Sequence, residues 1–195
     1  ISECLVGSEM CIRDRLNGNG PEDLRELVLV LTSLMVVKAG KAKDIREARI
    51  LLEETLDSGK ALQVMKEWIV AQGGTAEEVE HPDLLPQALC QEAVCAEKSG
   101  FVTKIHTEEI GRICMLLGGG RAKKGDPIDL SVGLVLRKKV GDPVHSGESL
   151  AILHANDREK LAEAKERLLK AYEIKKEPVA VRPLIWEILD GTEAE

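Results

Sequence analysis

The stretch that decides the fold class is residues 131–154, SVGLVLRKKVGDPVHSGESLAILH. Glycine turns divide it at Gly141-Asp142-Pro143 and at Ser146-Gly147-Glu148. The apolar runs here and just upstream are short, and four of them are expected to form strands: residues 92–97, 101–106, 131–136 and 149–154. Short strands at close spacing with glycine turns are typical of small β-rich barrels and sandwiches. The sequence therefore predicts a β-rich domain in this part of the chain.

Two helices are expected within this domain. Thr107 is expected to cap the first, because Glu108 and Glu109 follow it in the first turn. Asp157 is expected to cap the second, which carries many Glu and Lys residues on a solvated face. The predicted inner faces are Ile110, Ile113, Met115 and Leu116 in the first, and Leu161, Ala164, Leu168, Leu169 and Tyr172 in the second. An extended piece and a short apolar segment are expected over residues 178–189.

Upstream, apolar residues recur at helical spacing and predict three helices with short loops. The first begins near Pro21 and stops at Gly40, Asp44 caps the second, and Gly73-Gly74 ends the third. Their predicted inner faces are Leu24, Leu27, Val28, Leu31, Leu34 and Met35; Ile45, Ala48, Leu51, Leu52 and Leu56; and Ala61, Leu62, Met65, Trp68 and Ile69. Residues 75–90, which contain Pro82 and Pro86, are expected to form a connection at a domain boundary.

Composition disfavours several classes of function. Aromatic residues are 2% of the chain and its net charge is -7, which disfavours both base stacking and phosphate-backbone binding to nucleic acid. No apolar run approaches the roughly 18 residues that span a bilayer. The five cysteines are odd in number and lack CxxC spacing, so we expect reduced thiols in a cytoplasmic protein.

Residues 1–15 differ from the rest of the chain. They have no steady helical or strand period, and they resemble the translation of a sequencing adapter. We expect this stretch to be an artefact or disordered, with the true N-terminal half of the protein missing upstream of Leu16. The alternative is a genuine N-terminal arm.

The candidate site is the glycine-rich stretch of residues 118–127, GGGRAKKGDP. Its three glycines offer backbone N–H groups, and Arg121, Lys123 and Lys124 add positive charge that suits a phosphate or a contact between domains. The stretch matches neither common phosphate-loop pattern, and it follows a helix rather than a strand. A flexible, solvated loop is the alternative interpretation.

No metal or catalytic cluster is expected from the other polar residues. The four histidines are scattered, and no carboxylate lies at a spacing that indicates a metal site or an acid–base pair. Residues alone thus predict a helical segment joined to a β-rich domain, with the function open.

Several short motifs resemble those of thymidine and pyrimidine-nucleoside phosphorylases, in the same order along the chain. They are LNGNGPEDL at residues 16–24, SGKA at 58–61, AQGG at 71–74, GGGRAKK at 118–124, IDLSVG at 128–133 and VGDPV at 140–144. The resemblance implies the reversible phosphorolysis of a pyrimidine nucleoside to a free base and a pentose 1-phosphate. It leaves the choice between uridine and thymidine open.

The resemblance also implies a fold. Its class is α+β: residues 16–80 form helices from the end of a large α/β glycosyl-transfer domain, and residues 85–190 form a C-terminal α/β-hammerhead domain that resembles a barrel-sandwich. The intact enzyme is expected to be a homodimer that binds nucleoside and phosphate, but neither nucleic acid nor a membrane. No cofactor is implied beyond phosphate as co-substrate, with a potassium ion in some members.

The residues that perform catalysis in this family lie upstream of the matched motifs, so none is expected in this chain. The family's potassium-binding acid aligns with Cys11, inside the suspect stretch, and is not assigned. Arg121, Lys123 and Lys124 are the remaining candidates, through contact with the active cleft when domains close. Two alternatives stay open: an interaction module without catalysis, and a biotinyl- or lipoyl-like carrier modified at Lys138-Lys139, which lacks the usual flanking residues.

Overall fold

The computed structural model describes residues 12–19 and 21–189. They divide into two compact units, one of residues 81–181 and one of residues 12–80 together with 182–189. The division falls between Glu80 and His81. Each unit is described by itself.

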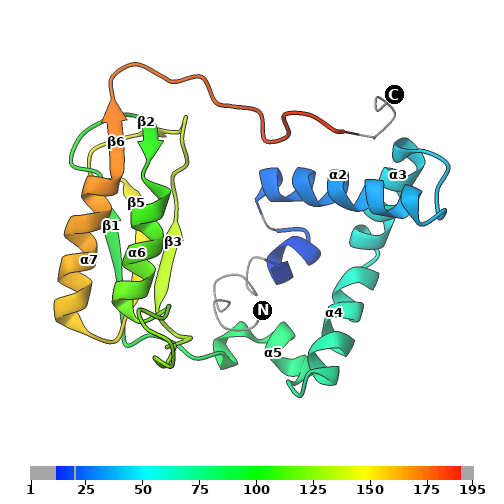
Figure 1. The fold of residues 1–195 in the computed structure, drawn as a ribbon, viewed down its shortest axis with the longest axis horizontal. Helices are drawn as coiled ribbons and strands as arrows, with labels where there is room; N and C mark the ends of the chain where they lie inside the picture. The colour runs from blue at the N-terminus through cyan, green and yellow to red at the C-terminus, as the bar shows by residue number, and fades with distance from the viewer. Residues whose placement is uncertain (1–11, 20, 190–195) are drawn as a thin grey trace. The chain divides into compact units, whose positions relative to one another are not determined.

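Two small antiparallel sheets form the centre of the 81–181 unit (Figure 1). The first has the order β1-β5-β3, with β1 at Cys90–Cys95, β5 at Ser149–Ala155 and β3 at Gly133–Leu136. The second has the order β4-β2-β6, with β4 at Pro143–Val144, β2 at Gly100–Ile105 and β6 at Tyr172–Lys175. The four predicted strands are thus confirmed within two residues at each end, and β4 and β6 are additional.

Helices α6 (Thr107–Leu117) and α7 (Arg158–Ala171) lie side by side and pack against the sheets (Figure 1). Arg167 on α7 pairs with Glu109 on α6 at 2.6 Å. Their inner residues complete one apolar core with both sheets: Val94, Val102, Ile113, Leu117, Val144, Leu150, Leu153, Leu161, Ala164 and Leu168. Burial of these aliphatic side chains is the main stabilising contribution in a unit that is poor in aromatic residues.

The start of α7 is as predicted and the start of α6 is not. The Asp157 carboxylate accepts hydrogen bonds from the backbone N–H of Glu159 at 2.8 Å and Lys160 at 3.1 Å. Thr107, by contrast, is the first residue inside α6, and the cap position falls on His106 without a side-chain hydrogen bond. The predicted cap is therefore wrong, because the helix begins at Thr107 itself, one residue before the predicted start.

The prediction that Tyr172 belongs to the inner face of α7 is also wrong. The helix ends at Ala171 and Tyr172 begins β6, where it pairs with Ile105 of β2. Its hydroxyl donates to the carbonyl oxygen of Lys138 at 3.0 Å, and burial raises the pKa of Tyr172 to about 12. The chain passes from helix to strand without glycine or proline, so the sequence contains no local signal of the change.

In the other unit, residues 12–16 are helical and are followed by four further helices. They are α2 (Glu22–Lys38), α3 (Ile45–Asp57), α4 (Lys60–Ala71) and the short α5 (Ala76–Glu80). Asp44 caps α3 as predicted, since its carboxylate accepts from the backbone N–H of Glu47 at 2.8 Å. A short 3-10 turn, η2 (Pro82–Leu84), then precedes β1 in the 81–181 unit.

The predicted inner faces of these helices are only partly confirmed. Ala48 and Met65 are buried, but Leu31, Met35 and Trp68 are 52%, 68% and 56% exposed. In α2 the buried residues are Leu29 and Ser33 instead. This helix is apolar on several sides, so periodicity alone does not identify the side that packs against α3.

The end of the suspect stretch makes defined contacts. The Arg15 side chain is buried and donates to the carbonyl oxygens of Gly18 at 3.1 Å and Pro21 at 2.9 Å. The prediction that residues 1–15 are an artefact or disordered also covers residues 1–11, which lie outside the described residues. In the described part of the chain, no helix combines the length and apolar character needed to cross a bilayer.

We predict that Gly100→Ala destabilises the 81–181 unit. A Cβ at Gly100 would lie 2.4 Å from the carbonyl oxygen of Lys175, so β2 and β6 would have to separate. We expect a loss of about 1–3 kcal/mol in the free energy of unfolding, measured by urea titration with far-UV circular dichroism.

Gly111→Ala is the matched control, because a Cβ at this position in α6 meets nothing within 4 Å. It should be neutral or raise stability by up to about 1 kcal/mol. Equal effects of the two substitutions would contradict the close approach of β2 and β6.

Candidate functional site

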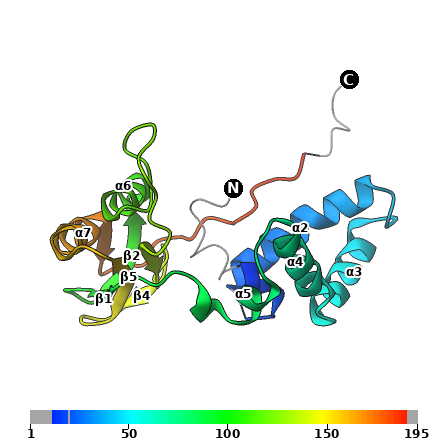
Figure 2. The ribbon, with the colours of Figure 1, turned by 90° about the horizontal axis from the view of Figure 1, so that it is seen from below.

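The basic loop, residues 118–127, begins at the C-terminal end of α6 and projects from it (Figure 2). Gly118 has φ +110 and is in the left-handed region, which favours glycine. Its N–H donates to the carbonyl oxygen of Met115 at 3.1 Å, and the N–H of Gly119 donates to that of Cys114 at 2.9 Å. These two N–H groups therefore cap α6. The expectation that all three glycines offer free N–H groups to a phosphate is wrong.

The tip of the basic loop is a turn organised by Asp126. Its carboxylate accepts from the backbone N–H of Lys123 at 2.8 Å, and its own N–H donates to the carbonyl oxygen of Lys123 at 3.1 Å. Arg121 Nε donates to the carbonyl oxygen of Asp126 at 3.2 Å. Gly125, with φ +97, supplies the left-handed residue that the turn requires. The tip is thus an ordered turn.

The loop brings the three predicted site residues together. Arg121, Lys123 and Lys124 are all exposed, within four consecutive positions of one turn. Among the described residues, no carboxylate forms an ion pair with the ammonium group of Lys123 or Lys124. The arrangement therefore presents positive charge to solvent, where an anion or an acidic surface of a partner domain can approach it.

Asp129 closes the base of the loop. Its N–H donates to the carbonyl oxygen of Gly118 at 2.9 Å, which joins the two ends of the loop. Its carboxylate accepts from Ser131 through the backbone N–H at 2.9 Å and the hydroxyl at 2.6 Å, and from Asn156 Nδ2 at 2.7 Å. These hydrogen bonds lower the pKa of Asp129 below its usual range, and the hydrogen bond from the Ser131 hydroxyl is the largest cause of the shift.

Asn156 ties this base to the sheet. It follows the last residue of β5, and its Nδ2 also donates to Ser131 Oγ at 2.9 Å. Its Oδ1 accepts from the backbone N–H of Leu89, next to the first residue of β1, at 2.7 Å. Sequence reasoning missed this network. The Asp-x-Ser spacing of Asp129 and Ser131 is a local turn signal, but nothing local points to Asn156.

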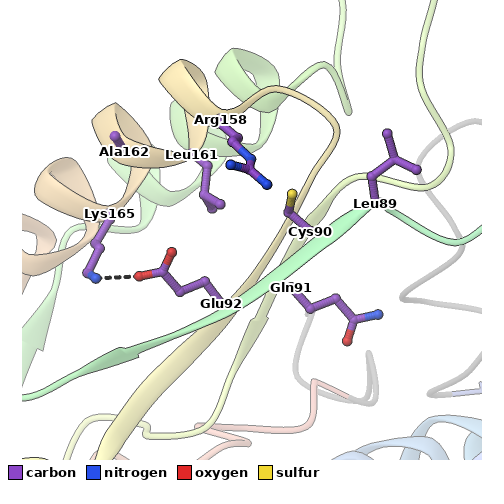
Figure 3. Close-up of a pocket in the computed structure, with 8 residues that line it drawn as sticks. All are labelled: Leu89, Cys90, Gln91, Glu92, Arg158, Leu161, Ala162 and Lys165. Atoms are coloured by element: carbon purple, nitrogen blue, oxygen red, sulfur yellow. Dashed lines mark hydrogen bonds and ion pairs between the residues drawn. The ribbon is translucent and has the colours of Figure 1, made fainter.

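An open depression lies between β1 and α7 in this unit (Figure 3). Its lining residues are Leu89, Cys90, Gln91, Glu92, Arg158, Leu161, Ala162 and Lys165. Glu92 and Lys165 form an ion pair across it, and Glu92 raises the pKa of Lys165. Each charge is thus neutralised by the other, and Cys90 has no histidine beside it in the lining to act as a base. The depression contains no recognisable catalytic arrangement.

The histidines and the lysine considered in the sequence analysis interact with neighbouring residues of the fold. His106 Nε2 lies 3.1 Å from a carboxylate oxygen of Glu173, and burial lowers the pKa of His154. Lys138 Nζ pairs with Glu148 at 2.6 Å and donates to the carbonyl oxygen of Pro143 at 2.9 Å, so it is not a free lysine at a hairpin tip. No group of three or more potential metal ligands occurs within residues 12–19 and 21–189.

Comparison with known proteins shows what the region that contains the basic loop is similar to. Residues 101–175 match the family model described as the pyrimidine nucleoside phosphorylase C-terminal domain. Pyrimidine-nucleoside phosphorylases of Staphylococcus aureus, from the bovine strain RF122 and from strains USA300 and COL, are each 52% identical to this chain over 143 residues. That match covers 73% of this chain and 33% of each relative. The chain therefore spans about a third of the length of the curated relatives it matches.

The depressed pKa of Asp129 predicts a pH-dependent stability. A carboxylate whose pKa is lower in the folded state stabilises the fold above its unfolded pKa of about 3.9, and this contribution is lost as the pH falls through the folded pKa. We expect Asp129→Asn to lower the free energy of unfolding by about 1 kcal/mol at pH 7. The difference from the parent should shrink at pH 3 in urea titrations, and an equal difference at both pH values would contradict the assignment.

Proposed function

We propose that this chain, which is homologous to the C-terminal region of the pyrimidine-nucleoside phosphorylases, is part of an enzyme that performs phosphorolysis of pyrimidine nucleosides. Phosphate would attack the sugar carbon of the nucleoside, release the free base and give a pentose 1-phosphate. The observation that carries the proposal is the 52% identity over 143 residues. The match of residues 101–175 to the model of the phosphorylase C-terminal domain supports it.

The chemistry requires groups that this chain does not supply alone. Phosphorolysis needs cations and N–H groups that hold phosphate beneath the sugar, and donors that stabilise charge on the leaving base. Within the described residues, neither the depression nor the histidines form such a constellation. We therefore assign the reacting groups to the part of the enzyme outside this chain. The basic loop would contribute Arg121, Lys123 and Lys124, at the phosphate or at a domain contact beside it.

The fold proposal follows the same division. Residues 85–190 would form the α/β-hammerhead domain, and residues 16–80 would be helices from the end of the large α/β domain. Exposed apolar side chains on the helices support the second assignment, because an isolated helical unit rarely leaves so many uncovered. They are Leu31, Met35, Ile45, Ile50, Leu51, Val64, Trp68 and Val70.

The assembly is proposed at the same level. The intact enzyme would be a cytoplasmic homodimer whose ligands are a pyrimidine nucleoside and phosphate, with no cofactor other than the potassium ion that the family resemblance implies. In the cytoplasm the described cysteines Cys90 and Cys95 would remain free thiols.

The test is a chimera in which residues of this chain replace the matched region of the Staphylococcus aureus USA300 enzyme. We expect release of uracil or thymine from uridine or thymidine only when phosphate is present. Chromatography of the free base and the sugar phosphate measures this release. A folded chimera without phosphate-dependent base release would overturn the proposal.

The chimera also tests the basic loop. Arg121→Ala/Lys123→Ala/Lys124→Ala should raise KM for phosphate by about tenfold or more, because charge-assisted hydrogen bonds are lost. The matched control, Lys160→Ala/Lys170→Ala/Lys176→Ala, removes the same charge from exposed positions outside the loop and should change KM little. Equal effects of the two triple variants would remove the loop from the site.

The uncovered helices make a separate prediction for this chain alone. Its exposed apolar side chains should bind the dye ANS and increase its fluorescence severalfold over that with the full-length Staphylococcus aureus enzyme, measured at equal concentration. Fluorescence no higher than that of the full-length enzyme would show that these faces need no further part of the protein to cover them.

A further inference from the structure

We infer that Asp129 and Asn156 form a clasp that sets the direction of the basic loop and so positions Arg121, Lys123 and Lys124 for phosphate. Both are positioning residues, since they act through the loop. The inference rests on the proposed function, and it gives Asp129 and Asn156 a role in the same site that neither the motifs nor the comparisons assign.

The first step is that the loop is closed at its base. The hydrogen bond from Asp129 N–H to the carbonyl oxygen of Gly118 holds the two ends of the loop together at 2.9 Å. At the tip, Asp126 bonds to Arg121 and Lys123, which fixes the shape of the turn. Contacts within the tip do not determine where the turn points relative to the sheet. That direction depends on how the base is anchored.

The second step is that the base is anchored to two strand ends. Asn156 follows β5 directly, donates to the Asp129 carboxylate and accepts from Leu89 beside β1. Strand β5 is the central strand of its sheet, which makes it a stiff support. The hydrogen bonds of Ser131 to the same carboxylate add a third point at the entry to β3. The loop base is thus attached to the ends of β1 and β5 and to the segment that leads into β3.

The third step is that the clasp and simple electrostatics predict opposite effects. Asp129 is negative, so its charge alone weakens the attraction of the loop for phosphate. Removing that charge should improve phosphate binding if Asp129 only contributes charge. If the carboxylate positions the loop, the same substitution should impair binding, since displacement of binding groups by about 1 Å is enough to lose their contacts.

The experiment uses the phosphorylase chimera and compares Asp129→Asn with the parent. We expect KM for phosphate to rise about fivefold to tenfold, with kcat and KM for the nucleoside within about twofold. If the amide oxygen introduced by Asp129→Asn keeps the hydrogen bonds from Ser131, the new NH2 group faces the NH2 group of Asn156, and neither can accept a hydrogen bond from the other. An unchanged or lower KM for phosphate would overturn the inference.

The exchange Asp129→Asn/Asn156→Asp provides the rescue. The new amide at position 129 can donate to the new carboxylate at 156, which still accepts from Leu89 N–H, so KM should return to within about twofold of the parent. In a chimera that already lacks the three loop cations, Asp129→Asn should have no further effect on KM. Failure of the rescue, or a full additional effect without the cations, would show that Asp129 acts by another route.

A second readout separates the clasp from the function. Trypsin cleaves after Arg and Lys, so its rate at Arg121, Lys123 and Lys124 in the folded chimera reports the freedom of the loop whether or not the protein is active. We expect Asp129→Asn to accelerate cleavage and the exchange variant to restore the parent rate. Asp142→Asn is the control, because Asp142 accepts from the backbone N–H of Lys139 at 2.7 Å in a turn outside the loop, and it should leave cleavage at these sites unchanged.

If the parent chimera lacks phosphorolysis, the proposed function fails while the cleavage rates still test the clasp. If the parent is active and Asp129→Asn changes neither cleavage nor KM for phosphate, the clasp fails while the function stands.

Discussion

The central position of strand β5 is the constraint on which the 81–181 unit depends. Backbone hydrogen bonds pair it with β1 on one edge and β3 on the other, and four of its seven residues are buried. The chain leaves β5 through Asn156 and Asp157, and Asp157 caps the N-terminus of α7. After α7 the chain forms β6, which pairs with β2. Because α6 packs against α7 on the same core, the start of the basic loop is also set by this strand.

Local chemistry predicted much of this fold from sequence. Asp44 and Asp157 cap helices as expected, since the side chain of a cap bonds to backbone a few residues away. What failed depends on distant partners. Strand β6 forms by pairing with β2. The side of α2 that is buried depends on its packing against α3. Neither partner can be read from the residues of the element itself.

The candidate site divides in the same way. The sequence placed Arg121, Lys123 and Lys124 in one loop because they are neighbours in the chain. It did not predict that Gly118 and Gly119 use their N–H groups to end α6. Asn156 could not have been found, because its bond to Asp129 joins residues 27 positions apart. The family match and the basic loop fall in the same region of the chain, since residues 101–175 include the loop.

The most direct measurement is the sequence of the genomic DNA upstream of Leu16, followed by an assay of the complete encoded protein with uridine or thymidine. The account predicts a continuous reading frame that extends well beyond this chain, and release of free base that requires phosphate. A reading frame that truly starts within residues 1–15, or base release that is absent or independent of phosphate, would contradict it.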